Sequence, residues 1–155
     1  MHSLIKHIVK NIGISLLLII SIVISTNANS EQSVEDTIKN RKALFSKNYN
    51  TAKKVQSLSS SGDFDAAKKL MLQMSENYKA LLEMFPDNTK EGFKTEVTSL
   101  VWEEKDKFNS LMEKSSNDMI ELASVIEETD NVRGVLGQLM WGNCKACHSK
   151  YRVEH

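Results

Sequence analysis

The stretch CKACH at residues 144–148 places two cysteines and a histidine within five consecutive residues, near the end of a 155-residue chain. Positions i, i+3 and i+4 share one face of a helix, so Cys144, Cys147 and His148 would face a single flat ligand. A C-x-x-C-H run is typical of covalent haem attachment, because each thiol can join one vinyl group and the adjacent imidazole can ligate the iron. The stretch therefore predicts one haem c, attached through Cys144 and Cys147, with His148 as the axial iron ligand.

Three other uses of a C-x-x-C pair are alternatives: a redox dithiol, a zinc site and a plain disulfide. A thioredoxin-like dithiol is expected early in a βαβ pattern, whereas this pair ends a chain with helical periodicity. Zinc would need a fourth ligand, and only His155 and distant residues are available; structural zinc sites usually show a second close pair. No other cysteine is present. Haem attachment is the interpretation that fits the run and its context.

The N-terminus has the layout of a secretory signal. Lys6, His7 and Lys10 precede an apolar run over residues 12–24, and small and polar residues follow over residues 25–30. The apolar run is short for a membrane span, which needs about 20 residues, although an uncleaved N-terminal anchor is the alternative.

We therefore expect residues 1–30 to be a cleaved signal peptide and residues 31–155 to form one exported, periplasmic domain. Export agrees with haem attachment, which in bacteria takes place outside the cytoplasmic membrane. Removal of the signal takes away two lysines and no acid, which leaves 18 basic and 20 acidic residues and a formal charge near −2. No basic stripe indicates a nucleic-acid partner.

About 125 residues are enough for one domain. The 3.6-residue period of apolar positions indicates four helical segments, and strand-like alternation is absent. These segments span about Ser33–Leu58, Asp65–Phe85, Lys94–Glu128 and Val132–Tyr151. Four amphipathic helices with short connections predict an all-α fold, an antiparallel up-down-up-down four-helix bundle, with the haem held in its core.

The chain resembles the class II c-type cytochromes, the cytochrome c′ family, in which the haem motif lies near the end of the last helix. The resemblance covers the whole mature chain and is carried by four segments. They are the C-K-A-C-H-x-x-Y-R ending of residues 144–152, the Ile38-x-x-Arg41-Lys42 pattern, the Gly62–Ala67 entry to the second helix, and Val101-Trp102 followed by Phe108.

The resemblance implies roles for three cations. Arg41 is expected to meet a haem propionate, since a guanidinium forks well onto carboxylate; pairing with a carboxylate on a neighbouring helix is the alternative. Lys42 stands where the family often has glutamine, so an ammonium would lie near the propionates. Arg152, four residues after His148, would contact that imidazole or the haem edge, or act as a helix-end cation.

The sixth iron ligand separates two kinds of family member. The residue four positions after the first-helix arginine faces the distal side of the iron, and in low-spin members it is a ligating methionine. Here that residue is Phe45, which cannot ligate, so five-coordinate, high-spin iron is expected. The methionines that could substitute lie at helical spacing among apolar residues, where methionine usually fills a core: Met71, Met74, Met84, Met112, Met119 and Met140.

The family resemblance implies electron transfer with redox partner proteins and binding of a small diatomic gas, nitric oxide or carbon monoxide. A low-spin electron carrier with a methionine sixth ligand is the alternative. We expect no enzyme, because no acid–base pair or nucleophile is visible near the motif. A homodimer is also implied, and residues off the inner stripes offer an outer patch: Leu44, Tyr49, Leu72 and Leu82. Trp141, three residues before Cys144, would pack on the haem edge or at the surface.

Overall fold

The computed structural model describes residues 33–154, and regular structure in this range is helical apart from one isolated β-bridge. Contacts divide the chain into two units, Met1–Asp36 and Thr37–His155. Of the first unit only residues 33–36 are described, and they are helical. The predicted signal peptide, residues 1–30, lies outside the described residues. The fold that follows is that of the second unit.

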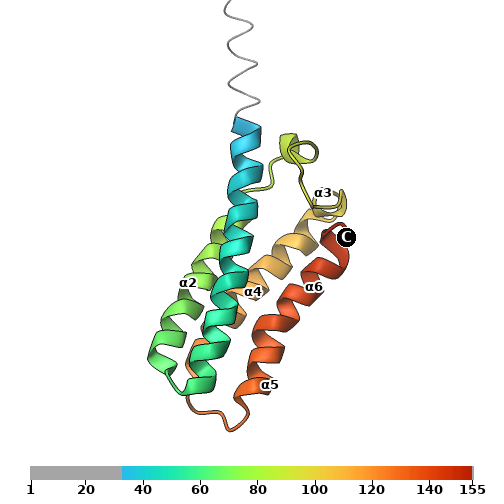
Figure 1. Ribbon diagram of the computed structural model, residues 1–155. Helices are drawn as coiled ribbons and strands as arrows, with labels where there is room; N and C mark the ends of the chain where they lie inside the picture. Colours follow the sequence, from blue (N-terminus) through green and yellow to red (C-terminus); the bar gives the residue numbers. More distant parts are fainter. Residues whose placement is uncertain (1–32, 155) are drawn as a thin grey trace, which may run out of the picture. The chain divides into compact units, whose positions relative to one another are not determined.

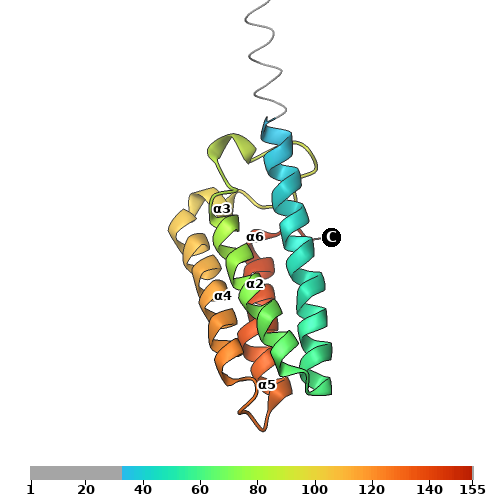
Figure 2. The same cartoon turned by 90° about the vertical axis from the view of Figure 1, so that its left-hand side faces the viewer.

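Four antiparallel helical rods pack side by side (Figures 1 and 2). The first helix, described over residues 33–61, is followed by α2 (Phe64–Leu82) and α4 (Lys105–Val125). The fourth rod is continuous but composite: α5 (Val132–Leu136), the π-helix η2 (Gly137–Trp141) and α6 (Gly142–Tyr151). The predicted four-helix bundle is confirmed.

The core lies between the rods and contains the apolar positions that recur every three to four residues along each helix. Five of the six methionines beyond Met1 are buried there, as the core interpretation predicts, and Met84 is partly buried. The fully buried apolar side chains include Ile38, Ala52, Val55, Ala67, Met71, Met74, Leu81, Val101, Leu122, Ile126 and Met140.

Short capped turns close one end of the bundle. Gly62 has φ of +82°, a left-handed conformation that glycine adopts without strain, and it ends the first helix. Asp63 then caps α2, because its carboxylate accepts a hydrogen bond from the Ala66 N–H. Asn131 caps α5 in the same way, by accepting from Gly134 N–H at 3.0 Å.

The opposite end is built differently from the prediction. A third helix was expected to begin at Lys94, but Phe93 and Lys94 both have positive φ, which a right-handed helix cannot contain. Residues 83–99 instead form a long connection that holds one short 3₁₀ helix, η1 (Asp87–Thr89). The third rod starts with α3 (Leu100–Glu103), breaks at Glu104 and continues as α4.

The C-terminal end of α6 is held by that same connection. Val97 and Arg152 form an antiparallel β-bridge, Thr98 N–H donates to the Tyr151 carbonyl at 3.0 Å, and Val153 N–H donates to the Glu96 carbonyl at 2.9 Å. The long connection therefore fixes the helix that carries the CKACH stretch.

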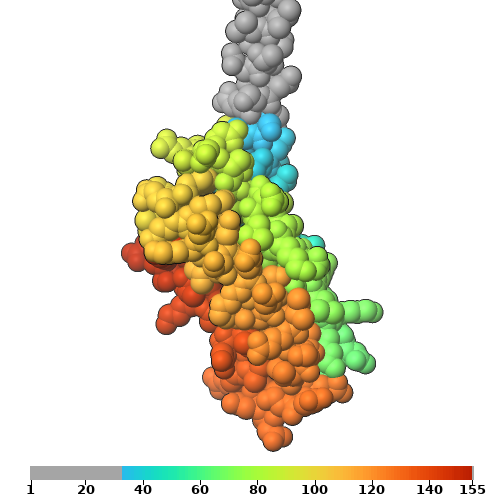
Figure 3. Space-filling view, turned by 180° about the vertical axis from the view of Figure 1, so that it is seen from behind, coloured from blue at the N-terminus to red at the C-terminus, as the bar shows by residue number. Residues whose placement is uncertain are grey.

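Figure 3 shows the back of the bundle, where α4 covers the centre with α2 on one side and the C-terminal helix on the other. No helix within residues 33–154 has the length and apolar character needed to span a bilayer.

Candidate haem-attachment site

The two cysteines and the histidine lie on α6, which confirms the helical spacing on which the prediction depended. Cys144 and Cys147 are both partly buried, and Cys147 packs against the hydrophobic core. His148 is exposed, and its side chain makes no hydrogen bond to any residue between 33 and 154. Consecutive turns of one helix thus present two thiols and an imidazole.

Burial keeps both sulfur atoms in the thiol form. Desolvation raises the pKa of Cys144, and it raises the pKa of Cys147 to about 11. Tyr78 of α2 contacts Cys144, and burial together with this contact raises the pKa of the Tyr78 phenol.

The surroundings of the His148 imidazole favour its neutral form. Desolvation of the ring, with the nearby Arg152 guanidinium as a second cause and Glu96 opposing it, lowers the pKa of His148 below its usual value. Neutral imidazole is the form that ligates a metal. Within residues 33–154 no three His, Cys, Asp or Glu side chains gather closely enough to bind a metal ion, so the described chain offers no zinc cluster around the thiols.

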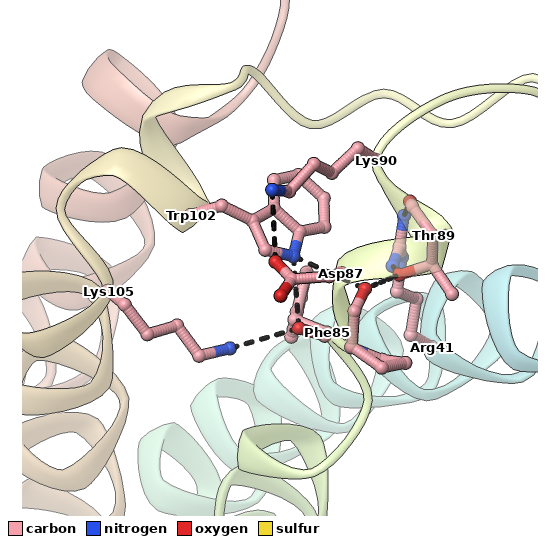
Figure 4. Close-up of polar contacts among 8 residues, drawn as sticks. Arg41, Phe85, Asp87, Thr89, Lys90, Trp102 and Lys105 are labelled. Carbon is pink, nitrogen blue, oxygen red and sulfur yellow. Dashed lines mark hydrogen bonds and ion pairs between the residues drawn. The ribbon is translucent and has the colours of Figure 1, made fainter.

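Arg41 extends from the first helix to Thr89 of the long connection (Figure 4). It is 1% exposed, and it donates to Thr89 Oγ1 at 2.7 Å, the Thr89 carbonyl at 3.0 Å, Thr95 Oγ1 at 2.7 Å and the Met84 carbonyl at 3.2 Å. Its guanidinium carbon lies 4.8 Å from the centre of the Phe85 ring. We call Arg41 with Met84, Phe85, Thr89 and Thr95 the Arg41 cage.

The cage is closed from the side of the third rod. Trp102 donates its indole N–H to the Phe85 carbonyl at 3.0 Å, and Lys105 donates to the same carbonyl at 3.2 Å. Lys90 pairs with Asp87 at 2.9 Å beside the Trp102 ring (Figure 4). Burial lowers the pKa of Arg41 to about 10, so the guanidinium is still charged at neutral pH.

One donor of Arg41 has no partner in the described chain. Nε is buried and unpartnered, whereas the two terminal nitrogens are engaged by the cage. A buried N–H of this kind fits an acceptor such as a carboxylate. The residues present therefore fit a haem: two thiols and an imidazole on one helix, and a charged donor on another helix with one N–H to spare.

Phe45 lies one helical turn after Arg41, as its spacing predicts, and is partly buried against the core. Its ring meets Phe85 edge-on at 6.3 Å; Phe85 meets Phe108 at 4.8 Å; and Phe108 meets Tyr151 at 5.3 Å. These four rings run from the first helix to α6, three residues beyond His148. The first helix and the end of α6 are thus joined through the core by a row of aromatic contacts.

Lys42 and Arg152, both predicted to lie near the haem, are brought together by one carboxylate. Glu96 pairs with Lys42 at 3.2 Å and with Arg152 at 2.9 Å. Lys42 also donates to the Lys94 carbonyl at 2.7 Å. The long connection thereby links the first helix to the end of α6, and both cations have a partner within the chain.

Trp141 is partly buried and packs against the first helix. Its indole N–H donates to Gln56 Oε1 at 2.8 Å, and its ring meets Tyr49 edge-on at 6.2 Å. Both partners lie on the first helix. Trp141 therefore joins the first and fourth rods one turn before Cys144.

Sequence reasoning missed the partners that surround the motif. Tyr78 fits the apolar period of the second helix, and nothing in its spacing indicates contact with Cys144. Thr89 and Thr95 lie in a segment without periodicity. Asn143 and Asp118 read as ordinary polar positions, although both are buried. A polar residue on an otherwise apolar helical face, as at Asp118 next to Met119, is the one signal that was available.

These features define a class of protein: four-helix bundles that bind haem c through a motif in their last helix. A sequence model of the family described as Cytochrome C′ matches residues 36–152. The chain belongs to the cytochrome c′ family, whose members bind haem c.

Named relatives agree with this assignment. The cytochrome c′ of Rhodopseudomonas palustris is 28% identical over 122 residues, covering 77% of this chain and 83% of the relative. Among solved structures, cytochrome c′ from Rhodobacter spheriodes superimposes with a TM-score of 0.69 at 19% identity, covering 79% of this chain and 98% of that one. Cytochrome c′ from Rubrivivax gelatinosus gives 0.65 at 23% identity, with coverage of 77% and 96%. These structures share the fold.

Proposed function

We propose that this protein is a periplasmic monohaem cytochrome that transfers electrons and binds a small diatomic gas at five-coordinate, high-spin iron. Cys144 and Cys147 hold the haem by thioether bonds, and His148 ligates the iron. The support is the placement of all three on one helix, the neutral imidazole, and the unpartnered Nε of Arg41, which is suited to a propionate.

The observation that carries the proposal is Phe45. It occupies the position that the family resemblance assigns to the distal side, and a phenyl ring offers no lone pair to iron. Five of the methionines that could replace it are buried in the core. The haem, when bound, supplies a redox-active iron, and the chain's own residues leave its distal side without a ligating side chain.

The proposal that the iron binds a gas also depends on Phe45. One of the superimposed structures is a nitric oxide complex of a cytochrome c prime mutant from Alcaligenes xylosoxidans, which shares the fold at a TM-score of 0.66 and 17% identity. In this chain the edge-on contact with Phe85 restrains the Phe45 ring, so a gas must pass a held side chain. We expect carbon monoxide and nitric oxide to bind the ferrous protein slowly.

Replacement of Phe45 tests the proposal. Phe45→Met supplies a thioether at the distal position and should give six-coordinate, low-spin iron with weakened carbon monoxide binding. Phe45→Ala should keep the high-spin spectrum and speed carbon monoxide binding. Leu44→Met, which adds the same thioether one position along the helix, is the control and should change neither. If Phe45→Met leaves spectrum and gas binding unchanged, Phe45 does not guard the iron.

A homodimer is the second element of the proposal, and the resemblance to the family motivates it. Tyr49 and Leu72 of the predicted patch are 51% and 48% exposed, whereas Leu44 and Leu82 are partly buried against the core. The exposed part of the patch thus consists of one residue on each of the first two helices. Sedimentation that shows only monomer at micromolar concentration would remove this element.

Export is the third element. The signal layout of residues 1–30 motivates it, and covalent haem attachment requires it in bacteria. Sequencing of the N-terminus of the purified haem protein should find a start near residue 31. Retention of residues 1–30 would favour the N-terminal anchor instead.

A further inference from the structure

A buried carboxylate lies beside the residue that precedes the first haem cysteine. Asp118 of α4 is 6% exposed, and Asn143 of α6 is 8% exposed. The Asn143 side-chain amide donates to Asp118 Oδ2 at 2.9 Å. Lys114, one turn earlier on α4 and itself largely exposed, forms an ion pair with the same oxygen. This Asp118–Asn143 pair is the buried polar link between α4 and α6.

The amide nitrogen of Asn143 uses both of its hydrogens. The second is donated to the Leu139 carbonyl at 2.7 Å, inside the π-helical segment. One side chain therefore ties the carboxylate of α4, the backbone of η2 and the backbone next to Cys144. A π-helical turn shifts the phase of the helix that follows it, and the contact with Asp118 fixes that phase.

A buried carboxylate acts on its surroundings more strongly than an exposed one. Charges inside a protein interact through a low effective dielectric and are little screened by salt, whereas exposed charges are largely screened. Burying Asp118 also carries a desolvation cost, which is common where a charge serves a site. The Lys114 ammonium offsets part of the negative charge, but it lies at the solvent side of the pair.

We propose that Asp118 lowers the reduction potential of the haem iron and that Asn143 is the positioning residue that holds the carboxylate against the haem-bearing helix. The proposal rests on haem attachment at Cys144, as proposed above. The reaction concerned is the one-electron reduction of ferric to ferrous haem by an external donor. Ferric haem carries one more positive charge than ferrous haem, so a nearby fixed anion stabilises the oxidised form and lowers the midpoint potential.

Potentiometric titration of the holoprotein tests this assignment. Asp118→Asn keeps the size of the side chain and an oxygen that can accept from Asn143, and it removes the charge; the midpoint potential should rise. Glu121→Gln, at an exposed acid one turn further along α4, makes the same change in net charge and is the matched control; its potential should stay near that of the unmodified protein. The Asp118→Asn shift should persist at about 1 M salt, where exposed charges are screened beyond about 3 Å.

Lys114→Gln should shift the midpoint potential in the opposite direction to Asp118→Asn. Loss of the ammonium leaves the carboxylate uncompensated, so the midpoint potential should fall. A merely structural role for the pair would not move the potential in opposite directions for the two variants. Lys114 is largely exposed, so this variant should fold and gives a measurement even if Asp118→Asn does not.

Asn143→Ser should retain covalent haem but lower the urea midpoint of unfolding, and it should shift the potential because the carboxylate is no longer held. Equal potentials in unmodified, Asp118→Asn and Lys114→Gln proteins that all carry covalent haem by intact mass would overturn the assignment. Absence of covalent haem from the unmodified protein would overturn the proposed function itself, so the two failures are distinguishable.

Discussion

The haem-bearing turn, residues 144–148, and the Arg41 cage are both suited to one cofactor, but the chain supports them very differently. On α6, His148 makes no hydrogen bond within the described residues, and Cys144 contacts Tyr78 and makes a long contact from its sulfur to the Met140 carbonyl at 3.6 Å. Arg41 makes four hydrogen bonds and lies over the Phe85 ring.

The difference separates two kinds of functional residue. The side chains of the haem-bearing turn react with or bind the ligand directly, so their identities and spacing are enough to predict the site from the sequence. In the Arg41 cage, threonine hydroxyls and backbone carbonyls accept hydrogen bonds from Arg41. These acceptors lie more than forty positions further along the chain. The cage is therefore stabilised by contacts within the chain, and the Nε–H of Arg41 remains available for the ligand. The following changes separate the two regions, from the largest expected effect to the smallest.

The largest effect is expected at the haem-bearing turn. In a Cys144→Ala, Cys147→Ala double variant, no thioether can form, so all haem should be lost on acid–acetone extraction and the intact mass should equal that of the chain alone. The unmodified protein should exceed its chain mass by one haem and keep it through extraction. Extractable haem in the unmodified protein would contradict attachment at this turn.

Replacement of Arg41 should be the most destabilising change outside that turn. Arg41→Met leaves the two threonines and the Met84 carbonyl without their donor, and we expect a loss of about 3–4 kcal/mol in the free energy of unfolding. Urea unfolding of the holoprotein measures it. Lys39→Met, at an exposed cation on the same helix, should stay within about 0.5 kcal/mol. A loss below about 1 kcal/mol for Arg41→Met would mean that the cage does not hold the connection.

Thr89→Val should have a smaller effect that depends on Arg41. The Thr89 hydroxyl accepts from Arg41 and donates to the Pro86 carbonyl at 2.8 Å, so its loss should cost about 1–2 kcal/mol. Because the two residues share hydrogen bonds, the cost should shrink in an Arg41→Met background. Additive unfolding energies in this double-mutant cycle would show that the contact contributes nothing to stability.

The smallest effect on the free energy of unfolding is expected at Trp141. This residue of the fourth rod contacts the first helix. Trp141→Phe keeps a ring against Tyr49 and removes the hydrogen bond to Gln56, and a half-exposed hydrogen bond contributes about 0.5–1 kcal/mol. Gln56→Leu should match it in urea unfolding. A cost above about 2 kcal/mol for either variant would indicate that the contact is part of the core.

The bundle and its haem motif could be predicted from the sequence because both depend on local spacing. Apolar residues every three to four positions indicated four rods, and C-x-x-C-H indicated the cofactor. The start of the third rod could not be predicted, because the left-handed backbone at Phe93 and Lys94 is imposed by the connection that reaches Arg41 and α6. A non-glycine residue with positive φ leaves no mark on hydrophobic periodicity.

The π-helical segment was missed for a related reason. Residues 132–151 fit an unbroken helix, because the apolar positions on either side of the π-helical segment are too few to reveal the change of phase. Asn143 and Asp118 depend on that phase, so their contact was hidden as well. Arg41 could be singled out from the family resemblance, but its four hydrogen bonds within the chain are long-range and form only once the connection is folded.

The most direct test of the central claim is the absorption spectrum of the purified protein in its ferric and ferrous states. The account predicts predominantly high-spin iron in both states, with His148 as the only protein ligand, and a change of the ferrous spectrum when carbon monoxide is added. A low-spin ferric spectrum with a methionine–iron charge-transfer band and no response to carbon monoxide would contradict it. The protein would then be an electron carrier with a methionine sixth ligand.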